Sequence, residues 1–261
     1  MRSLSIGATG MLAQQLNVEV ISHNIANMNT TAFTRRRAEF QDLLYQNLRR
    51  VGSDSSDTGT IVPAGVQIGL GVKTAAVYRI TEQGNLTLTE NTFDLAINGK
   101  GYFQVELPNG DTAYTRAGSF QTSADGEIVT ADGFIVQPAI TIPSDAVDVS
   151  INASGQVLVQ QDGKVAPTNV GQLQLATFSN EAGLLAIGDN LFLETPASGT
   201  PTTGNPGSPG IGTIQQGFLE TSNVNVVDEI TNLITAQRAY EMNSKVIETS
   251  DQMMSTLNNI R

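Results

Sequence analysis

Both ends of the chain carry long stretches in which apolar residues return every seven positions, and this feature limits the possible folds most. Residues 4–28 contain no Pro, and residues 224–260 contain neither Gly nor Pro, so both stretches predict helices. Each predicted helix has more apolar positions than one antiparallel partner can cover. We therefore expect the two helices to pair and to bury their remaining apolar faces against another domain or another subunit.

Apolar residues at seven-, three- and four-residue spacing define the predicted contact positions of the two helices. These positions are Leu4, Met11, Leu12, Leu16, Val18, Ile21 and Ile25 in the first helix, and Val226, Ile230, Leu233, Ile234, Tyr240, Ile247, Met254 and Leu257 in the second. Neither helix can cover its apolar faces alone, so we expect both to be largely disordered until the chain assembles.

The middle of the chain predicts short antiparallel strands. Alternating apolar runs are separated by Asn-Gly and Asp-Gly dipeptides, the strongest local signal for a hairpin turn. The predicted strands include residues 102–107, 127–130, 134–137 and 156–160. Nothing in this region alternates strand with helix. The predicted fold class is therefore α+β, with the terminal helices paired in a coiled-coil-like core domain and an antiparallel β-rich domain between them.

Two stretches rich in Gly, Pro, Ser, Thr and Asp read as linkers, at residues 52–65 and 195–212. They suggest four parts. The terminal-helix assembly domain comprises residues 1–35 and 223–261, and an extended connector comprises residues 36–71. The β-rich outer domain comprises residues 72–194, and a Gly/Pro-rich loop with a return linker comprises residues 195–222.

Composition excludes several classes of function. The net charge is −11, and residues 51–219 hold 5 Lys or Arg against 16 Asp or Glu, so nucleic acid and anionic membranes would repel this chain. The chain has no Cys, which excludes disulfides, zinc–thiolate sites and cysteine nucleophiles. No stretch near the N-terminus has the apolar length of a membrane span or the layout of a cleaved signal peptide.

The remaining chemistry gives no catalytic, metal or cofactor site. His23 is the single histidine, and its neighbour Ser22 points about 100° away from it on a helix, so the two cannot form a nucleophile–base pair. A structural or interfacial role for His23 is expected. The acids of the middle region fall mostly in hairpin turns, and no glycine cluster has phosphate-binding spacing. A paired-carboxylate glycosidase stays open as an alternative, because its two acids can lie far apart in sequence.

Several runs resemble the bacterial flagellar axial proteins, the rod and hook family. The run NIANMNTTAF at residues 24–33 is similar to the N-terminal signature of that family, and residues 217–257 are similar to its C-terminal helix, most closely in the distal-rod branch. Residues 93–105 and 112–121 also match, in the same order. The positions that carry the N-terminal signature are Asn24, Ile25, Ala26, Asn27, Thr30, Thr31 and Phe33.

The resemblance implies a structural, non-enzymatic subunit of the distal rod, without cofactor or metal. Such a subunit would polymerise into a straight helical tube that transmits torque across the periplasm and encloses the export channel. Its implied partners are further copies of itself, proximal rod proteins, a hook or junction protein, the ring proteins that act as a bushing, and the flagellar type III export apparatus. Export by that route would need no cleaved signal peptide, and no membrane insertion or nucleic-acid binding is implied.

Residues 45–71 are similar to a segment that marks the distal rod. The resemblance implies that this segment braces neighbouring subunits, with Gly52, Ser53, Asp54, Thr60, Pro63 and Gly65 as its rod-specific positions. A proximal rod or hook subunit is the nearest alternative. A cell-wall-acting enzyme and a monomeric secreted binding module are alternatives of other classes.

One position departs from the family pattern. Ala32 stands where the family usually has Gly. If that site needs a positive φ angle, Ala would cost on the order of 1 kcal/mol.

Overall fold

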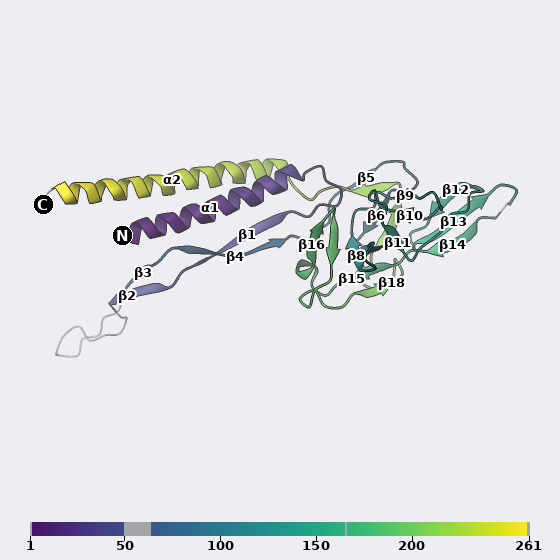
Figure 1. Ribbon diagram of the computed structural model, residues 1–261, viewed down its shortest axis with the longest axis horizontal. Helices are drawn as coiled ribbons and strands as arrows, with labels where there is room; N and C mark the ends of the chain where they lie inside the picture. The colour runs from purple at the N-terminus through teal and green to yellow at the C-terminus, as the bar shows by residue number, and fades with distance from the viewer. Residues whose placement is uncertain (1, 50–63, 165, 260–261) are drawn as a thin grey trace. The chain divides into compact units, whose positions relative to one another are not determined.

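The computed structural model describes residues 2–49, 64–164 and 166–259, and these residues form two compact units (Figure 1). The helical unit comprises Met1–Ala26, Arg36–Tyr78 and Asn225–Arg261. The β unit comprises Asn27–Arg35 and Arg79–Val224. The α+β organisation predicted from the sequence is confirmed, with a helix at each end of the chain and antiparallel strands between them.

Two long antiparallel helices form the core of the helical unit. Helix α1 spans Arg2–Ala26 and α2 spans Val226–Asn259, within two residues of the predicted ends. Asn225 caps α2, since its Oδ1 accepts the backbone N–H of Val227 at 3.1 Å. Asp228 and Glu229 lie in the first turn of α2, where negative charge is favourable. In the described part of the chain, neither helix combines the length and the apolar character that a bilayer span requires.

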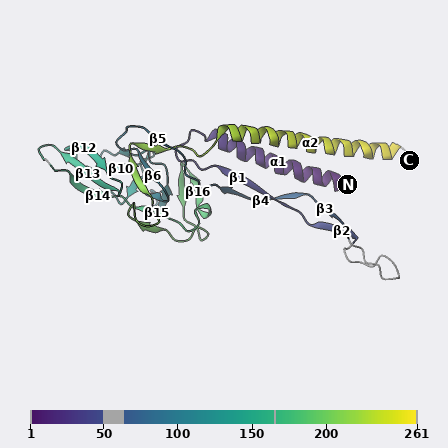
Figure 2. The same ribbon diagram turned by 180° about the vertical axis from the view of Figure 1, so that it is seen from behind.

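A β ribbon covers the side of α1 that faces away from α2 (Figures 1 and 2). Strand β1 (Arg36–Asp42) pairs with β4 (Val72–Arg79), and β2 (Tyr45–Arg49) pairs with β3 (Val66–Gly69). Thr9 of α1 accepts the backbone N–H of Val72 through its Oγ1 at 3.4 Å. Helix α1 is therefore covered on two sides, whereas the extensive packing of α2 within the described part of the helical unit is along α1.

The described part of the β unit is built around a nine-stranded antiparallel sheet. Its strands follow the order β16-β17-β8-β7-β11-β10-β9, while β15 pairs with both β7 and β18. Strands β12, β13 and β14 form a second sheet, and two smaller pairs, β6 with β19 and β5 with β20, bring the end of the unit back onto its beginning.

The strands of the β unit have the following bounds: β5 Leu86–Leu88, β6 Leu95–Asn98, β7 Tyr102–Glu106, β8 Thr112–Thr115, β9 Gln121–Thr122, β10 Ile128–Val129, β11 Ile135–Gln137, β12 Ala146–Ile151, β13 Gln156–Gln161, β14 Thr168–Gln172, β15 Leu175–Thr177, β16 Leu185–Gly188, β17 Leu191–Leu193, β18 Thr202–Gly204, β19 Thr213–Gln216 and β20 Phe218–Glu220.

Large apolar side chains fill the interior of the β unit. Phe103 and Phe120 are fully buried and meet edge to face, with ring centroids 5.0 Å apart. Leu95, Ile97 and Leu175 pack in the same cluster. A second cluster joins Tyr102, Tyr114 and Phe178, and burial raises the pKa of Tyr102 well above its usual range. This interior has the composition of an ordinary globular core.

The Asn-Gly and Asp-Gly turns after β7, β9, β10 and β13 each join two paired strands, as predicted, whereas Asn98-Gly99 follows β6, which pairs with β19 and not with the next strand, β7. Gly126, in the Asp125-Gly126 turn, has a φ of +82°, and a Cβ added there would lie 2.4 Å from the carbonyl oxygen of Ile142. Glycine is therefore required at this turn. The predicted strands at residues 102–107, 127–130, 134–137 and 156–160 are present as β7, β10, β11 and β13. The segment 195–212 contains strand β18, which its Gly/Pro-rich composition did not predict.

Candidate functional site

The seam between α1 and α2 is the first candidate surface, because both helices carry predicted contact residues. A Cβ added to Gly7 would lie 2.9 Å from Cγ1 of Ile247, and one added to Gly10 would lie 2.9 Å from Nδ2 of Asn243. The two glycines therefore allow a close approach of the helix backbones at this end of the pair.

A buried polar cluster closes the other end of the seam. Asn24 is 1% exposed, and its side-chain amide matches the backbone of Arg36: Nδ2 donates to the carbonyl oxygen at 2.8 Å, and Oδ1 accepts the N–H at 2.8 Å. Nδ2 also lies 3.3 Å from Oε2 of Glu229, which is buried on α2. Asn24 thus joins α1, the first residue of β1 and α2.

Small and polar residues follow α2 along the seam. Glu229, Ala236, Asn243 and Ser250 recur every seven positions; Asn243 is half-buried and the other three are buried. Half-buried Leu233, Ala239 and Ile247 are apolar residues that lie between them. This seam is unlike the apolar interior of an ordinary helical hairpin.

The outer faces of the same helices are apolar. On α2, Val227 and Met242 are 71% and 69% exposed, and Leu12 on α1 is 66% exposed. The other exposed apolar residues of the pair are Ile6, Ile230, Ile234, Tyr240, Val246, Met253 and Met254. Apolar patches of this kind mark surfaces that another molecule covers.

The predicted contact positions are divided between the seam and the outer faces. Ile21 is buried, and Leu4, Met11, Leu16, Val18, Ile25, Val226, Leu233 and Ile247 are half-buried. Leu12, Ile230, Ile234, Tyr240 and Met254 are exposed. The side chain of Leu257, together with Gly52, Ser53, Asp54, Thr60 and Pro63, lies outside the described residues.

The N-terminal signature continues from the end of α1 into a turn of the β unit. Ile25 and Ala26 close the helix, while Asn27, Thr30, Thr31 and Phe33 follow it in half-buried positions. Thr30 Oγ1 donates to Asn27 Oδ1 at 3.1 Å.

Ala32, which stands where the family usually has Gly, adopts a φ of +55°. The site therefore has the left-handed backbone conformation that was considered for it from the sequence. The strain of this conformation is on the order of 1 kcal/mol. The Ala32 N–H donates to the carbonyl oxygen of Glu220 at 2.8 Å, which holds the turn in place.

Asn223 holds together the segment that precedes β1 and the segment that follows β4. The sequence did not single this residue out. Its Oδ1 accepts the N–H of Arg35 at 2.7 Å, and its Nδ2 donates to the carbonyl oxygens of Ile80 and Glu82 at 2.9 Å each. Its own N–H donates to the carbonyl oxygen of Phe33 at 3.2 Å. A polar residue just before a helix usually suggests a cap, but the cap of α2 is Asn225, so no local signal indicated these distant partners.

A buried ion pair joins Arg116 to Glu220. Nε and Nη2 of Arg116 each lie 2.9 Å from Oε2 of Glu220, and both side chains are less than one-tenth exposed. The guanidinium also donates to the carbonyl oxygens of Gly99 and Gly101, while Oε1 of Glu220 accepts the N–H of Gly84. Every partner is part of the β unit's framework, so this pair holds the fold and leaves no free group for chemistry.

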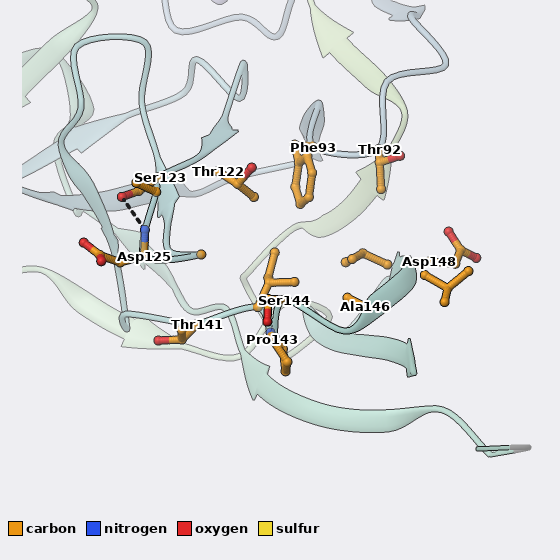
Figure 3. A pocket seen from close by; sticks show the side chains of 15 residues that line it. Thr92, Phe93, Thr122, Ser123, Asp125, Thr141, Pro143, Ser144, Ala146 and Asp148 are labelled. Atoms are coloured by element: carbon orange, nitrogen blue, oxygen red, sulfur yellow. Dashed lines mark hydrogen bonds between the residues drawn. The ribbon is translucent and has the colours of Figure 1, made fainter. Parts of the chain in front are cut away.

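A groove in the β unit and the single histidine are further candidates for chemistry. A groove of about 600 Å³ in the β unit is lined by hydroxyl side chains, Phe93, Asp125 and Asp148 (Figure 3). The Ser123 hydroxyl is engaged by the N–H of Asp125 at 3.3 Å, and no basic side chain is among the described residues of the lining. His23 is exposed, and partial desolvation and then Arg36 lower its pKa. Among the described residues, no three metal-ligating side chains cluster.

Three family models match this chain, and together they cover both helices and much of the β unit. Residues 4–34 match the flagella basal body rod protein model, and residues 96–159 match the D1 domain of the flagellar hook protein FlgE/F/G. Residues 215–260 match the C-terminal model of the flagellar basal body rod FlgEFG proteins.

Similar proteins share the whole length of the chain. The flagellar basal-body rod protein FlgG of Caulobacter vibrioides is 62% identical over 261 residues, covering 100% of both chains. FlgG of Agrobacterium fabrum is 56% identical, covering 98% of this chain and 97% of its own. FlgG of Bacillus subtilis is 40% identical, covering 100% of this chain and 99% of its own.

Proposed function

The chain belongs to the FlgG family of flagellar basal-body rod proteins, and from that premise we propose that it is a subunit of the straight distal part of the rod. It is a structural subunit of the basal-body rod. The proposal adds that its copies form a helical tube, that the tube encloses the export channel, and that it transmits torque across the periplasm.

One observation carries the proposal: the helix pair buries the polar residues Asn24, Glu229 and Ser250 in its seam, while many of its large apolar side chains are exposed. If the chain stayed a monomer, Val227, Met242 and Leu12 would remain in water. Each Å² of apolar surface left exposed forgoes about 25 cal/mol of favourable burial free energy. Copies that repeat the same contact along a screw axis bury these faces and give an open filament. Torsional stiffness follows from apolar contacts shared along both helices.

The β ribbon of the helical unit supports a bracing role for the segment that resembles the distal rod. Leu44 is 83% exposed, and Tyr45, Leu48 and Val66 are also exposed on this two-stranded element. A two-stranded ribbon of this kind gains little stability from itself alone. We propose that this ribbon and the segment 45–71 contact neighbouring subunits and keep the rod straight.

The proposal carries further expectations about partners and transport. The subunit would meet copies of itself, proximal rod proteins below, a hook or junction protein above, and ring proteins around it. It would leave the cytoplasm through the flagellar type III apparatus without cleavage of a signal peptide, and it would have no catalytic activity. Its domains would be those expected from the sequence, with residues 1–35 and 223–261 as the assembly domain.

Immunogold labelling of isolated hook–basal bodies tests the proposal. Antibodies against the β unit should label the outer part of the rod in cells that carry the wild-type chain, and cells that lack its gene should build no hook. Label on the hook, or only on the inner part of the rod, would favour the alternative axial positions and contradict the distal assignment. Removing residues 52–65 should make the rod lose straightness or length, whereas a hook subunit would be little affected.

A further inference from the structure

Six of the exposed apolar residues of α2 form two faces on opposite sides of the seam, while exposed Tyr240 and Met254 lie on the line of the seam residues Leu233 and Ile247. Val227, Ile230 and Ile234 make the N-half face, and Met242, Val246 and Met253 make the C-half face. Residues seven positions apart lie on one line along the helix. Measured as rotation about the helix axis, the N-half face lies about 80° to 130° from the centre of the seam in one direction. The C-half face lies about the same angle from the seam in the other direction.

Each face occupies only half the length of α2, and polar residues fill the other half. Beyond the N-half face, the same side of the helix carries Glu241, Glu248 and Asp251, all exposed. Ahead of the C-half face, the corresponding side carries exposed Asp228, Asn232 and Thr235. The two sides of α2 therefore have the same pattern in reverse order.

A groove extends the N-half face by about one helical turn. It has a volume of about 320 Å³ and is lined by Gln15 and Val18 of α1 and by Gln237, Tyr240 and Glu241 of α2. Gln237 and Glu241 lie on the side of α2 that carries the N-half face, so the groove and the face are continuous.

We propose that neighbouring copies pack α2 against α2 in the same direction, with the N-half face of one copy on the C-half face of the next, displaced by about 16 residues or about 24 Å along the helix. This inference rests on the proposed function, since a rod needs subunits that all point the same way. A displacement of 16 residues sets Ile230 opposite Val246 and the groove at Gln237 opposite Met253.

Charge selects this displacement over level packing. If two copies lay side by side at the same height, Glu241, Glu248 and Asp251 of one would be buried against Met242, Val246 and Met253 of the other. Burying unpaired carboxylates against apolar side chains is costly. The displaced contact leaves Glu248 and Asp251 outside it, and the two faces themselves contain no Asp, Glu, Lys or Arg; Glu241 lines the groove that receives Met253.

The chemistry of the two faces also suits a contact between unlike faces. The N-half face consists of β-branched residues, which hold one rotamer in a helix. The C-half face contains two methionines, whose flexible side chains fill an irregular groove such as the one beside Tyr240. Contact between two N-half faces is isologous, so it closes a pair of copies and cannot repeat from each copy to the next along a filament.

The absence of Cys in the natural chain makes a cross-linking test direct. The full-length chain is produced in flagellated cells as Ile230→Cys, Val246→Cys and Asn232→Cys single variants, and in co-expressed pairs. Hook–basal bodies are isolated and treated with a short bismaleimide. The control pair is Thr231→Cys with Gln252→Cys, which lie opposite the seam on α2 and belong to neither face.

The expected result is a cross-linked dimer from Ile230→Cys with Val246→Cys, and its loss from Ile230→Cys with Asn232→Cys and from the control pair. A double variant, Ile230→Cys/Val246→Cys, should give a ladder of multimers. Cross-links between residues 230 and 232 would show level packing, and dimers from Ile230→Cys alone would show paired like faces. Either result, or no cross-link from any variant in assembled rods, would overturn the displaced contact.

Two readouts keep this inference separate from the proposed function. Immunodetection of the wild-type chain in the isolated bodies comes first, and its absence there would overturn the rod assignment and with it the contact. If the chain is present and the cross-links differ from expectation, only the displaced contact fails. Where Ile230→Cys prevents assembly, Val227→Cys with Met242→Cys tests the same contact one turn away.

Discussion

The two units of this protein distribute their apolar side chains in opposite ways. In the β unit, Phe103, Phe120 and Leu95 are buried at about 1% exposure or less. In the helical unit, the best-buried seam positions include Asn24, Glu229 and Ser250, while Val227 and Met242 are in solvent. The β unit therefore completes its core within one chain, whereas the helical unit leaves apolar surface that, under the proposed function, other copies would cover.

The largest expected effect comes from the core of the β unit. Phe103→Ala removes a fully buried ring together with its edge-to-face contact to Phe120 and leaves a cavity in the core. The free energy of unfolding should fall by about 4 kcal/mol. Chemical denaturation of the monomer, followed by circular dichroism, measures this loss.

Ile230→Ala is the matched truncation on the outer face of α2. It should change the monomer's free energy of unfolding by less than about 0.5 kcal/mol, because Ile230 is exposed. Equal losses from Phe103→Ala and Ile230→Ala would erase the contrast between the two units.

A second large effect is expected at the buried ion pair. Glu220→Gln leaves the Arg116 guanidinium buried without its counter-charge and should cost about 3 kcal/mol in the free energy of unfolding. Exposed Glu194→Gln is the control and should be nearly neutral. If Glu220→Gln lowers the free energy of unfolding by less than about 1 kcal/mol, the ion pair contributes little to holding β20 against the rest of the β unit.

A smaller effect is expected at the polar seam. Asn24→Ala leaves both backbone groups of Arg36 without their side-chain partner and should cost about 2 kcal/mol locally. Hydrogen exchange measures this directly, since the Arg36 amide should lose protection while the amides of β7 keep theirs. If the Arg36 amide stays protected in the variant, the Asn24 side chain is not what holds β1 against α1.

The smallest effect is expected at Ala32. Ala32→Gly relieves the left-handed strain of about 1 kcal/mol, but a glycine also loses more conformational entropy on folding. The net result should be a gain of about 0.5 kcal/mol by chemical denaturation. Ala32→Val is the opposing control, because a β-branched residue is poorly suited to a positive φ, and a loss of stability on Ala32→Gly would contradict this account of the turn.

The sequence predicted those parts of the fold that local patterns encode. The seven-residue spacing of Val226, Leu233 and Ile247 indicated α2, and Asp125-Gly126 indicated a hairpin. Both patterns determine the structure of the residues in which they occur, so they can be recognised from the local sequence. The spacing also indicated that one partner helix could not cover all the apolar positions of α1, and the β ribbon now accounts for part of that surplus.

Other parts depend on pairings between distant residues and were not predictable. Asn24 meets Glu229 across 205 positions, and Asn223 meets Arg35 across 188. Apolar spacing alone also could not show which line of α2 faces α1, because lines of apolar residues run on both sides of it. The polar line through Glu229, Asn243 and Ser250 occupies the seam together with half-buried Leu233 and Ile247, and the remaining apolar lines are exposed.

Hydrogen exchange of the whole chain, as a monomer and in isolated rods, tests whether assembly completes the helical unit. In the monomer, the amides of α1 and α2 should exchange orders of magnitude faster than those of β7 and β8, because the helical unit buries few large apolar side chains. In the rod, the same helical amides should become as protected as the β unit. Helices already protected in the monomer to the level of β7 would contradict the claim that assembly completes the helical unit.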